Sequence, residues 1–258
     1  MRITLIQTDI AWEDKQENLR RLQLSLEKLK GKTDLVVLPE TFTTGFSMNV
    51  KRLAEPQSGP TLSLLQQWAS KYRTALAGSF IGLHEDGTFR NRFFFLTPDG
   101  QAFYYDKRHL FRMGKENQHF QAGTERPIIH YNGFRILPQI CYDLRFPVWS
   151  RNVNNEYDLM IYVACWPEAR REVWDVLLQA RAFENQCYVC GVNRTGTDGN
   201  GLAYNGGSVV YSPKGERLAS IPDGHEGIAT VSIDLEVLQH FRQKFPVWED
   251  ADAFNIQP

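Results

Sequence analysis

The sequence predicts a mixed α/β fold in which two β-sheets face each other and helices cover their outer sides. Strand and helix patterns alternate at both ends of the chain, whereas its middle consists of strands joined by hairpin turns. Some predicted strands are short, unbroken apolar runs, which are typical of strands covered on both faces. Together these observations favour mixed sheets over a purely parallel sheet.

The first elements are a strand, a helix and a second strand. Residues 2–8 alternate in character and predict a strand. Asp14, with a glutamate three positions later, has the spacing of a helix start, and leucines then recur at helical spacing until Gly31. The apolar run 34–38 predicts a buried strand, and Glu40 follows its end.

A helix and two hairpins are predicted for the middle of the chain. Pro60 suits the first turn of a helix whose apolar residues recur up to Tyr72. Two Asp-Gly pairs then mark hairpin turns. Lys107 follows the last strand of this region. The strands are predicted at residues 75–83, 92–97 and 102–105.

The second half resumes the alternation of strands and helices. An apolar strand at 134–140 ends directly before Cys141, and a charged pair and a proline follow, which a strand interior would not accept. We expect helices around 174–182 and at 235–243. Further strands are predicted at 158–164, 187–192, 208–211, 218–221 and 227–233.

Length and charge limit the classes of function. We expect residues 1–258 to form one domain, with the tail from about residue 246 packing on a neighbouring subunit. Lysine and arginine number 29 against 30 aspartates and glutamates, a net charge of −1 without long runs of one sign. This balance predicts a small-molecule ligand rather than nucleic acid or a membrane surface. With no long apolar segment, the protein is expected to be soluble and cytoplasmic.

The four cysteines are expected to be reduced, because they are few and lie in apolar strand segments. Cys187 and Cys190 form a CxxC pair, but strand alternation would point their side chains to opposite faces. No second pair is present to complete a zinc site. The sequence therefore predicts neither a metal nor a cofactor.

Glu40, Lys107 and Cys141 each fall at or just beyond the end of a predicted strand, where open α/β sheets bind ligands. A carboxylate could take the proton of the thiol, and the ammonium and the backbone N–H of Tyr142 could stabilise an oxyanion. Acyl transfer through a thioester is the implied reaction. The alternatives are a surface ion pair beside a core thiol, and a Cys-His hydrolase in which a histidine such as His109 is the base.

The segments 38–40, 106–110 and 141–147 resemble, in this order, the three motif blocks of the nitrilase or carbon-nitrogen hydrolase superfamily, and the chain looks closest to bacterial omega-amidases. The resemblance implies a four-layer α-β-β-α sandwich, a triad of Glu40, Lys107 and Cys141, and a homodimer or larger homo-oligomer. It also suggests Glu116 as a second glutamate that helps to orient the lysine or the substrate nitrogen.

Omega-amidases hydrolyse the terminal amide of short dicarboxylate monoamides such as 2-oxoglutaramate and 2-oxosuccinamate. A substrate of this kind carries a carboxylate that suits arginine, and Arg170 and Arg194 follow strand ends. Phe42 and Trp166 are candidates for the pocket wall. The alternatives are another carbon-nitrogen hydrolase, namely a nitrilase, a carbamoylase or an N-acyl amidase, and a binding protein of the same fold without activity.

Overall fold

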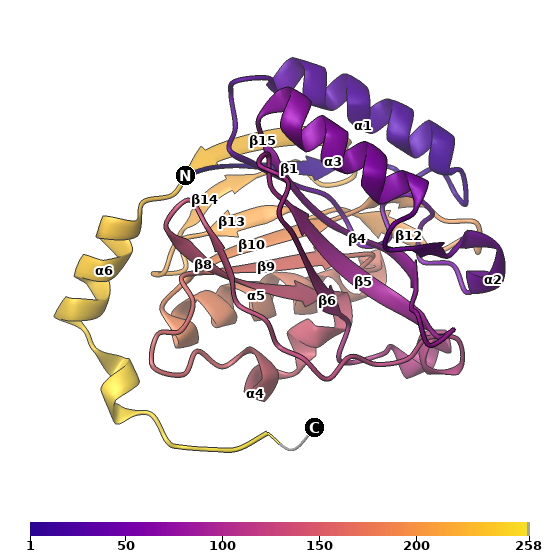
Figure 1. Ribbon diagram of the computed structural model, residues 1–258. Coiled ribbons are helices and arrows are strands. Elements are labelled where there is room, and N and C mark those ends of the chain that lie inside the picture. The colour runs from indigo at the N-terminus through magenta and orange to yellow at the C-terminus, as the bar shows by residue number, and fades with distance from the viewer. Residues whose placement is uncertain (257–258) are drawn as a thin grey trace.

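The computed structural model describes residues 1–256 and contains two large β-sheets that lie face to face (Figure 1). Residues 257–258 of the predicted domain lie outside the described residues. The first sheet has the strand order β15-β1-β2-β4-β5-β6, with β3 beside β4. Its strands are β1 (Arg2–Gln7), β2 (Leu35–Val37), β3 (Glu55–Pro56), β4 (Ala75–Leu83), β5 (Phe89–Leu96), β6 (Ala102–Asp106) and β15 (Gly227–Ser232).

The second sheet has the order β14-β13-β10-β9-β8-β7, and a short hairpin, β11-β12, stands apart from it. Both large sheets mix parallel pairs, such as β1 with β2 and β8 with β9, and antiparallel pairs. The strands are β7 (Ile129–Tyr131), β8 (Phe134–Ile140), β9 (Leu159–Ala164), β10 (Tyr188–Asn193), β11 (Thr195–Thr197), β12 (Ala203–Asn205), β13 (Val209–Tyr211) and β14 (Arg217–Ser220).

Helices α1 (Lys15–Leu29) and α3 (Pro60–Tyr72) cover the outer face of the first sheet, and α5 (Arg171–Asn185) covers the second (Figure 1). The backbone N–H of Glu17 donates to the Asp14 carboxylate at 3.0 Å, which confirms the predicted start of α1. The mixed α/β class and the α-β-β-α layers are therefore confirmed. The short helices α2 (Val50–Leu53) and α4 (Pro147–Ser150) were not predicted from the sequence.

Strand alternation distributes the side chains of β5 between two apolar regions. Phe93 and Phe95 point into the core between the sheets, whereas Phe94 packs under the outer helices. All three side chains are fully buried, and burying each stabilises the fold by about 1.5–3 kcal/mol. The run of three phenylalanines therefore joins the inner core to the outer layer.

Close packing explains the glycine inside β10. A Cβ atom at Gly191 would lie 2.4 Å from Leu178 and 2.9 Å from Trp174, both on α5. Only glycine lets the helix approach the strand this closely. The second sheet and its covering helix are thus held together without a gap.

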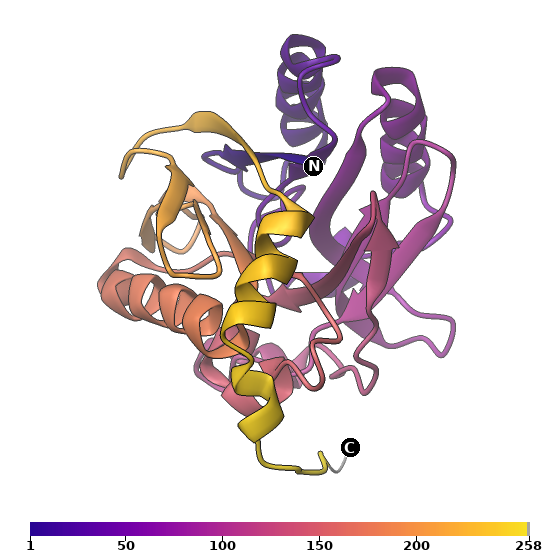
Figure 2. The same ribbon diagram turned by 90° about the vertical axis from the view of Figure 1, so that its left-hand side faces the viewer.

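The last helix, α6 (Leu235–Lys244), runs down one side of the molecule and leads to an exposed C-terminal segment (Figure 2). The segment reaches the side of α4, where Phe254 and Val148 border the same shallow depression. Packing of this tail on a neighbouring subunit stays a prediction. Among residues 1–256, no helix combines the length and apolar character needed to cross a membrane.

We predict that Leu65→Ala lowers the free energy of unfolding by about 2–5 kcal/mol, because it leaves a cavity between α3 and the first sheet. Leu65 is fully buried, whereas Leu24 on α1 is 47% exposed. The matched variant Leu24→Ala should change the stability by less than about 0.5 kcal/mol. Denaturant unfolding of both variants measures the difference, and equal losses would contradict the assignment of the core.

Candidate active site

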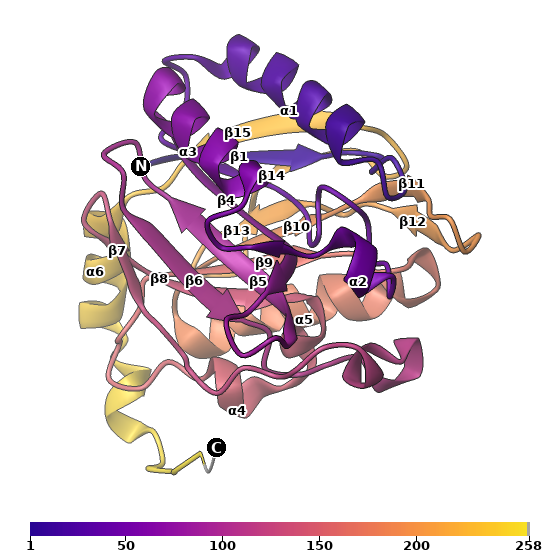
Figure 3. The ribbon, with the colours of Figure 1, turned by 45° about the vertical axis from the view of Figure 1, so that its right-hand side comes forward.

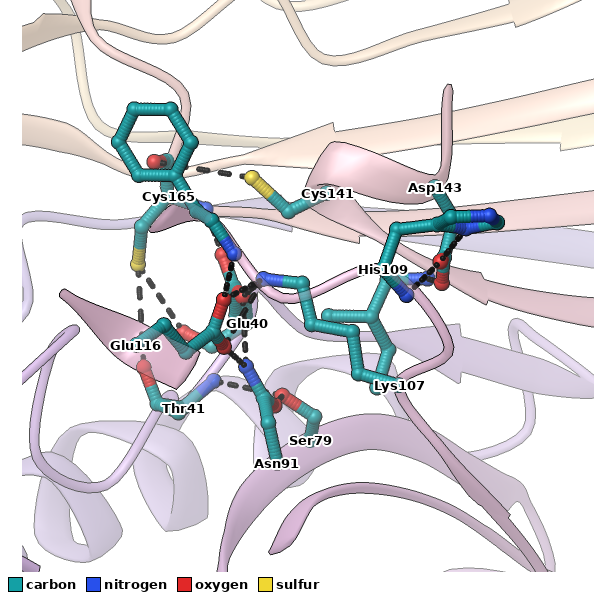
Figure 4. Close-up of polar contacts among 12 residues, drawn as sticks. Glu40, Thr41, Ser79, Asn91, Lys107, His109, Glu116, Cys141, Asp143 and Cys165 are labelled. Atoms are coloured by element: carbon teal, nitrogen blue, oxygen red, sulfur yellow. Dashed lines mark hydrogen bonds and ion pairs between the residues drawn. The ribbon is translucent and has the colours of Figure 1, made fainter. Parts of the chain in front are cut away.

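The chain brings Glu40, Lys107 and Cys141 together from three strand ends on two sheets (Figure 4). Glu40 follows β2, Lys107 follows β6 and Cys141 follows β8. The Lys107 ammonium donates to Glu40 Oε1 at 2.8 Å, and both side chains are excluded from solvent. Glu40 and Lys107 therefore form a buried ion pair, and the alternative of a surface ion pair is wrong.

A second carboxylate also contacts the ammonium. Glu116 opens the 3₁₀ turn Glu116–Gln118, and its Oε2 lies 3.0 Å from Lys107 Nζ. The same oxygen accepts from the backbone N–H of Phe111 at 2.6 Å. Burial raises the pKa of Glu116 above its ordinary value, and the nearby Lys107 ammonium opposes that rise. Glu116 is thus part of a buried cluster of charges, not a solvated residue of a polar loop.

Cys141 lies at a tight turn directly after β8. Its backbone has φ of +45°, in the left-handed region that residues other than glycine rarely adopt. Burial and the negative charge of Glu40 raise the pKa of the thiol well above its ordinary value, although Lys107 acts in the opposite direction. The thiol is therefore protonated at neutral pH, and nucleophilic attack needs a base within the site.

Asp143 joins the turn of Cys141 to the loop of Lys107. Its carboxylate accepts from the backbone N–H of Ile140 at 3.0 Å and from that of His109 at 2.9 Å. It also accepts from the Tyr105 hydroxyl at 2.7 Å. One buried carboxylate therefore fixes the backbone on both sides of the site.

His109 is engaged in this support and does not line the cavity. Its Nδ1 lies 2.8 Å from Asp143, and its ring stacks on Phe146 with 3.7 Å between the ring centres. The cavity beside Cys141 has no histidine among the residues described. This arrangement supplies no histidine base for a Cys-His hydrolase.

Two polar residues that the sequence analysis did not select complete the cluster. The Asn91 amide on β5 donates to Glu40 Oε1 at 2.7 Å and to Glu116 Oε1 at 3.0 Å. The hydroxyl of Ser79 on β4 donates to the side-chain oxygen Oδ1 of Asn91 at 3.0 Å. Asn91 could have been found in the sequence as a polar residue next to an apolar strand segment. Such an asparagine is expected to be buried, and a buried asparagine needs hydrogen-bond partners.

The backbone after β9 supplies one further donor. The N–H of Cys165 donates to Glu40 Oε2 at 2.8 Å, so both oxygens of Glu40 are bonded. The thiol of Cys165 points toward the carbonyl oxygen of Glu40, at 3.2 Å. Among residues 1–256 there is no cluster of His, Cys, Asp or Glu arranged to hold a metal ion.

A cavity of about 170 Å³ opens beside Cys141 and is bordered by the loop 198–202 of the β11-β12 hairpin, which lies on the same side of the molecule as α2 (Figure 3). Of the four predicted substrate-binding residues, Arg170 and Trp166 line it. The remaining lining residues are Glu40, Phe46, Met48, Lys107, Phe111, Gly114, Cys141, Tyr142, Arg145, Cys165, Pro167, Asp198, Asn200, Leu202 and Tyr204.

Phe42 and Arg194 are not among the residues that line the cavity. Phe42 points to the outer face of the first sheet and packs on Phe94, with 5.9 Å between the ring centres. Arg194 is fully buried, and its guanidinium donates to Asp9 at 2.8 Å. Its guanidinium lies over the ring of Tyr204, at 4.7 Å, and Tyr204, not Arg194, lines the cavity.

A second arginine at the cavity, Arg145, was not predicted from the sequence to bind the substrate. Arg145 is exposed and lies over the Trp166 ring, at 5.3 Å, while Arg170 lies over the Phe111 ring, at 5.2 Å. Neither arginine forms an ion pair with a described carboxylate. Their positive charges are therefore free to meet an anionic ligand.

A sandwich of two sheets between helices, with a thiol, an ammonium and a carboxylate at one cavity and a second carboxylate on the ammonium, is the architecture of a nitrilase-type hydrolase. The model of the carbon-nitrogen hydrolase family matches residues 2–243, and the chain belongs to this family. The family resemblance of the three sequence segments is thereby confirmed.

Named relatives and a solved structure agree with this assignment. The chain is 46% identical over 256 residues to omega-amidase YafV of Yersinia enterocolitica, covering 99% of this chain and 98% of the relative. It is 31% identical to the 2-oxoglutaramate amidase of Bacillus subtilis over 96% of both chains. A carbon-nitrogen hydrolase superfamily protein of Xanthomonas campestris, solved with an arsenic adduct in its active site, has a TM-score of 0.96 at 42% identity, covering 100% of this chain and 99% of that chain.

We predict that iodoacetamide alkylates Cys141 faster as the pH rises from about 7 to about 9. The thiolate is the reacting form, and below the raised pKa of the thiol each pH unit changes its fraction about tenfold. Mass spectrometry of the intact protein measures the rate, and Cys141→Ala shows which added mass belongs to this residue. A rate that does not change across this range would contradict a protonated resting thiol.

Proposed function

We propose that this chain is an omega-amidase that hydrolyses the terminal amide of short dicarboxylate monoamides to the acid and ammonia. The observation that carries the proposal is the cavity itself, which is lined by a thiol, an ammonium, a carboxylate and two arginines that form no ion pair within residues 1–256. The omega-amidase and 2-oxoglutaramate amidase relatives support the same substrate class. 2-Oxoglutaramate and 2-oxosuccinamate are the substrates of choice for a test.

In the proposed reaction, Glu40 accepts the proton of Cys141 while the sulfur attacks the amide carbon. The Lys107 ammonium and the backbone N–H of Tyr142 stabilise the negative charge that develops on the carbonyl oxygen. Glu40 then donates the proton to the departing ammonia and leaves a thioester on Cys141. Water, activated by the same glutamate, hydrolyses the thioester and releases the acid.

The surroundings of each group support this division of roles. A buried thiol with a raised pKa needs a proton acceptor at short range, and Glu40 is held there by Lys107. Burial alone would lower the pKa of Lys107, but the two nearby carboxylates outweigh it and raise that pKa well above the ordinary value, which keeps the ammonium charged. Glu116 is proposed to hold the ammonium in place rather than to exchange protons.

The carboxylate of the substrate is proposed to bind Arg170, with Arg145 as a second cation on the same cavity. Trp166 and Phe111 support the two guanidinium groups and leave their N–H edges available. The cavity of about 170 Å³ fits a small molecule and favours a short monoamide over a long acyl chain.

We further propose that the chain acts as one domain within a homodimer or larger homo-oligomer in the cytoplasm. Val148 on α4 and Val176 on α5 are 57% and 58% exposed, and exposed apolar groups favour association. The four free cysteines suit a reducing compartment. Light scattering during size-exclusion chromatography tests the assembly, and a monomer at micromolar concentration would contradict it.

Removing the nucleophile or the oxyanion donor should abolish measurable turnover without unfolding the protein. Cys141→Ala should release no ammonia from 2-oxoglutaramate above the buffer rate. Lys107→Ala should lower kcat at least about 10²–10³-fold, as loss of one oxyanion donor does. Circular dichroism checks that both variants are folded. Turnover by Cys141→Ala at the rate of the unaltered protein would contradict the thioester mechanism.

A panel of small substrates separates this function from its relatives. Ammonia release should be fastest with 2-oxoglutaramate, and slower with a nitrile, an N-carbamoyl amino acid or an N-acyl amine of similar size. Arg170→Ala should raise KM for 2-oxoglutaramate by about tenfold or more, since a charge-assisted contact is lost. It should leave KM for a neutral short amide nearly unchanged. Preference for a substrate without a carboxylate would point to another carbon-nitrogen hydrolase.

A further inference from the structure

The side chain of Asn91 contacts both carboxylates of the buried cluster. Its Nδ2 donates one hydrogen to Glu40 Oε1 at 2.7 Å and the other to Glu116 Oε1 at 3.0 Å. Its backbone carbonyl accepts from the backbone N–H of Lys107 at 2.9 Å. A single residue of β5 therefore touches the three charged residues of the buried cluster, and this residue is almost completely buried, with 1% exposed.

A chain of hydrogen bonds sets the direction of this amide. The backbone N–H of Thr41 donates to Ser79 Oγ at 2.8 Å, which leaves the hydroxyl hydrogen of Ser79 for Asn91 Oδ1, at 3.0 Å. If the amide turned over, its oxygen would face two carboxylates and its NH₂ would face an oxygen that already accepts a hydrogen bond. Ser79 thus keeps the NH₂ group directed at Glu40 and Glu116.

The geometry of these contacts makes Asn91 and Ser79 positioning residues for the base, and we propose that they keep Glu40 in its proton-accepting form when the substrate amide arrives. A donor on a carboxylate stabilises the ionised form, and the buried cluster has only one ammonium for two carboxylates. This proposal rests on the proposed function, in which Glu40 takes the proton of Cys141.

Other groups around Glu40 do not replace the amide. Lys107 donates to the same oxygen, but it is shared with Glu116, and the N–H of Cys165 occupies the second oxygen of Glu40. The Cys141 thiol faces Glu40 as a proton donor in the reaction itself. When Asn91 is lost, Glu40 therefore loses a donor to Oε1 that no other described group replaces.

The test is the pH dependence of kcat/KM for 2-oxoglutaramate in Asn91→Leu, which keeps the size of the side chain but removes its donors. Because the active base is the unprotonated carboxylate, losing the donors moves the acid limb of the profile to higher pH, by about one unit or more. Ser79→Ala leaves the donors but frees the amide to turn, and the limb should move in the same direction by less.

Asn152→Leu is the matched control, because this buried asparagine bonds only backbone groups and the Asn185 side chain, at a loop away from the cavity. Its acid limb should coincide with that of the unaltered protein. A folded Asn91→Leu with an unmoved acid limb would overturn the proposal, even if kcat fell equally at every pH. If Asn91→Leu does not fold, an unmoved limb in Ser79→Ala overturns it.

A second measurement does not depend on the substrate. Infrared difference spectra across the acid range follow the carbonyl band of a protonated carboxylic acid, and its loss in Glu40→Gln assigns the band to Glu40. In Asn91→Leu this band should appear at a pH about one unit higher than in the unaltered protein. The same pH in both proteins would overturn the positioning role. A displaced band without any amide hydrolysis would instead count against the proposed function alone.

Discussion

The site depends on one buried arrangement, a lysine ammonium in contact with two carboxylates, whose three side chains have no exposed surface. Removing these charges from water costs several kcal/mol per ion, and the mutual attraction offsets the cost only where the geometry is close and every remaining polar atom is bonded. Here Lys107 lies about 3 Å from Glu40 and from Glu116, and backbone and amide donors occupy the other oxygens. The strand ends, the loop after β6 and the turn at Cys141 must all be in place for this balance to exist.

The sequence predicted the layers and the three residues at strand ends because these follow from local patterns. Apolar runs and Asp-Gly turns set the strands, and strand ends place Glu40, Lys107 and Cys141 where both sheets open on one cavity. Their order along the chain matched a family, although Glu40 and Lys107 are 67 positions apart. The local sequence patterns and the family resemblance therefore pointed to the same three positions.

The rest of the site was not predictable in the same way, because it depends on which face a side chain takes and on contacts between distant segments. Phe42 comes two positions after Glu40, but both lie in the turn beyond β2, where strand alternation does not apply, and Phe42 packs in the outer apolar cluster. Arg194 follows a strand end, as Arg170 does, yet it pairs with Asp9 from the beginning of the chain. The partners of Asn91 lie on three other segments, so its spacing in the sequence carries no sign of them.

The arginines at the cavity have a consequence for release of the product. Hydrolysis turns a neutral amide into a carboxylate, so the product of the proposed reaction carries one more negative charge than the substrate. In the proposed binding mode, that new charge forms beside Glu40, whereas the original carboxylate stays near Arg145 and Arg170. Within the product, repulsion at the new carboxylate then opposes attraction at the original one. The reaction itself therefore weakens the binding of the anion that the guanidinium groups attract.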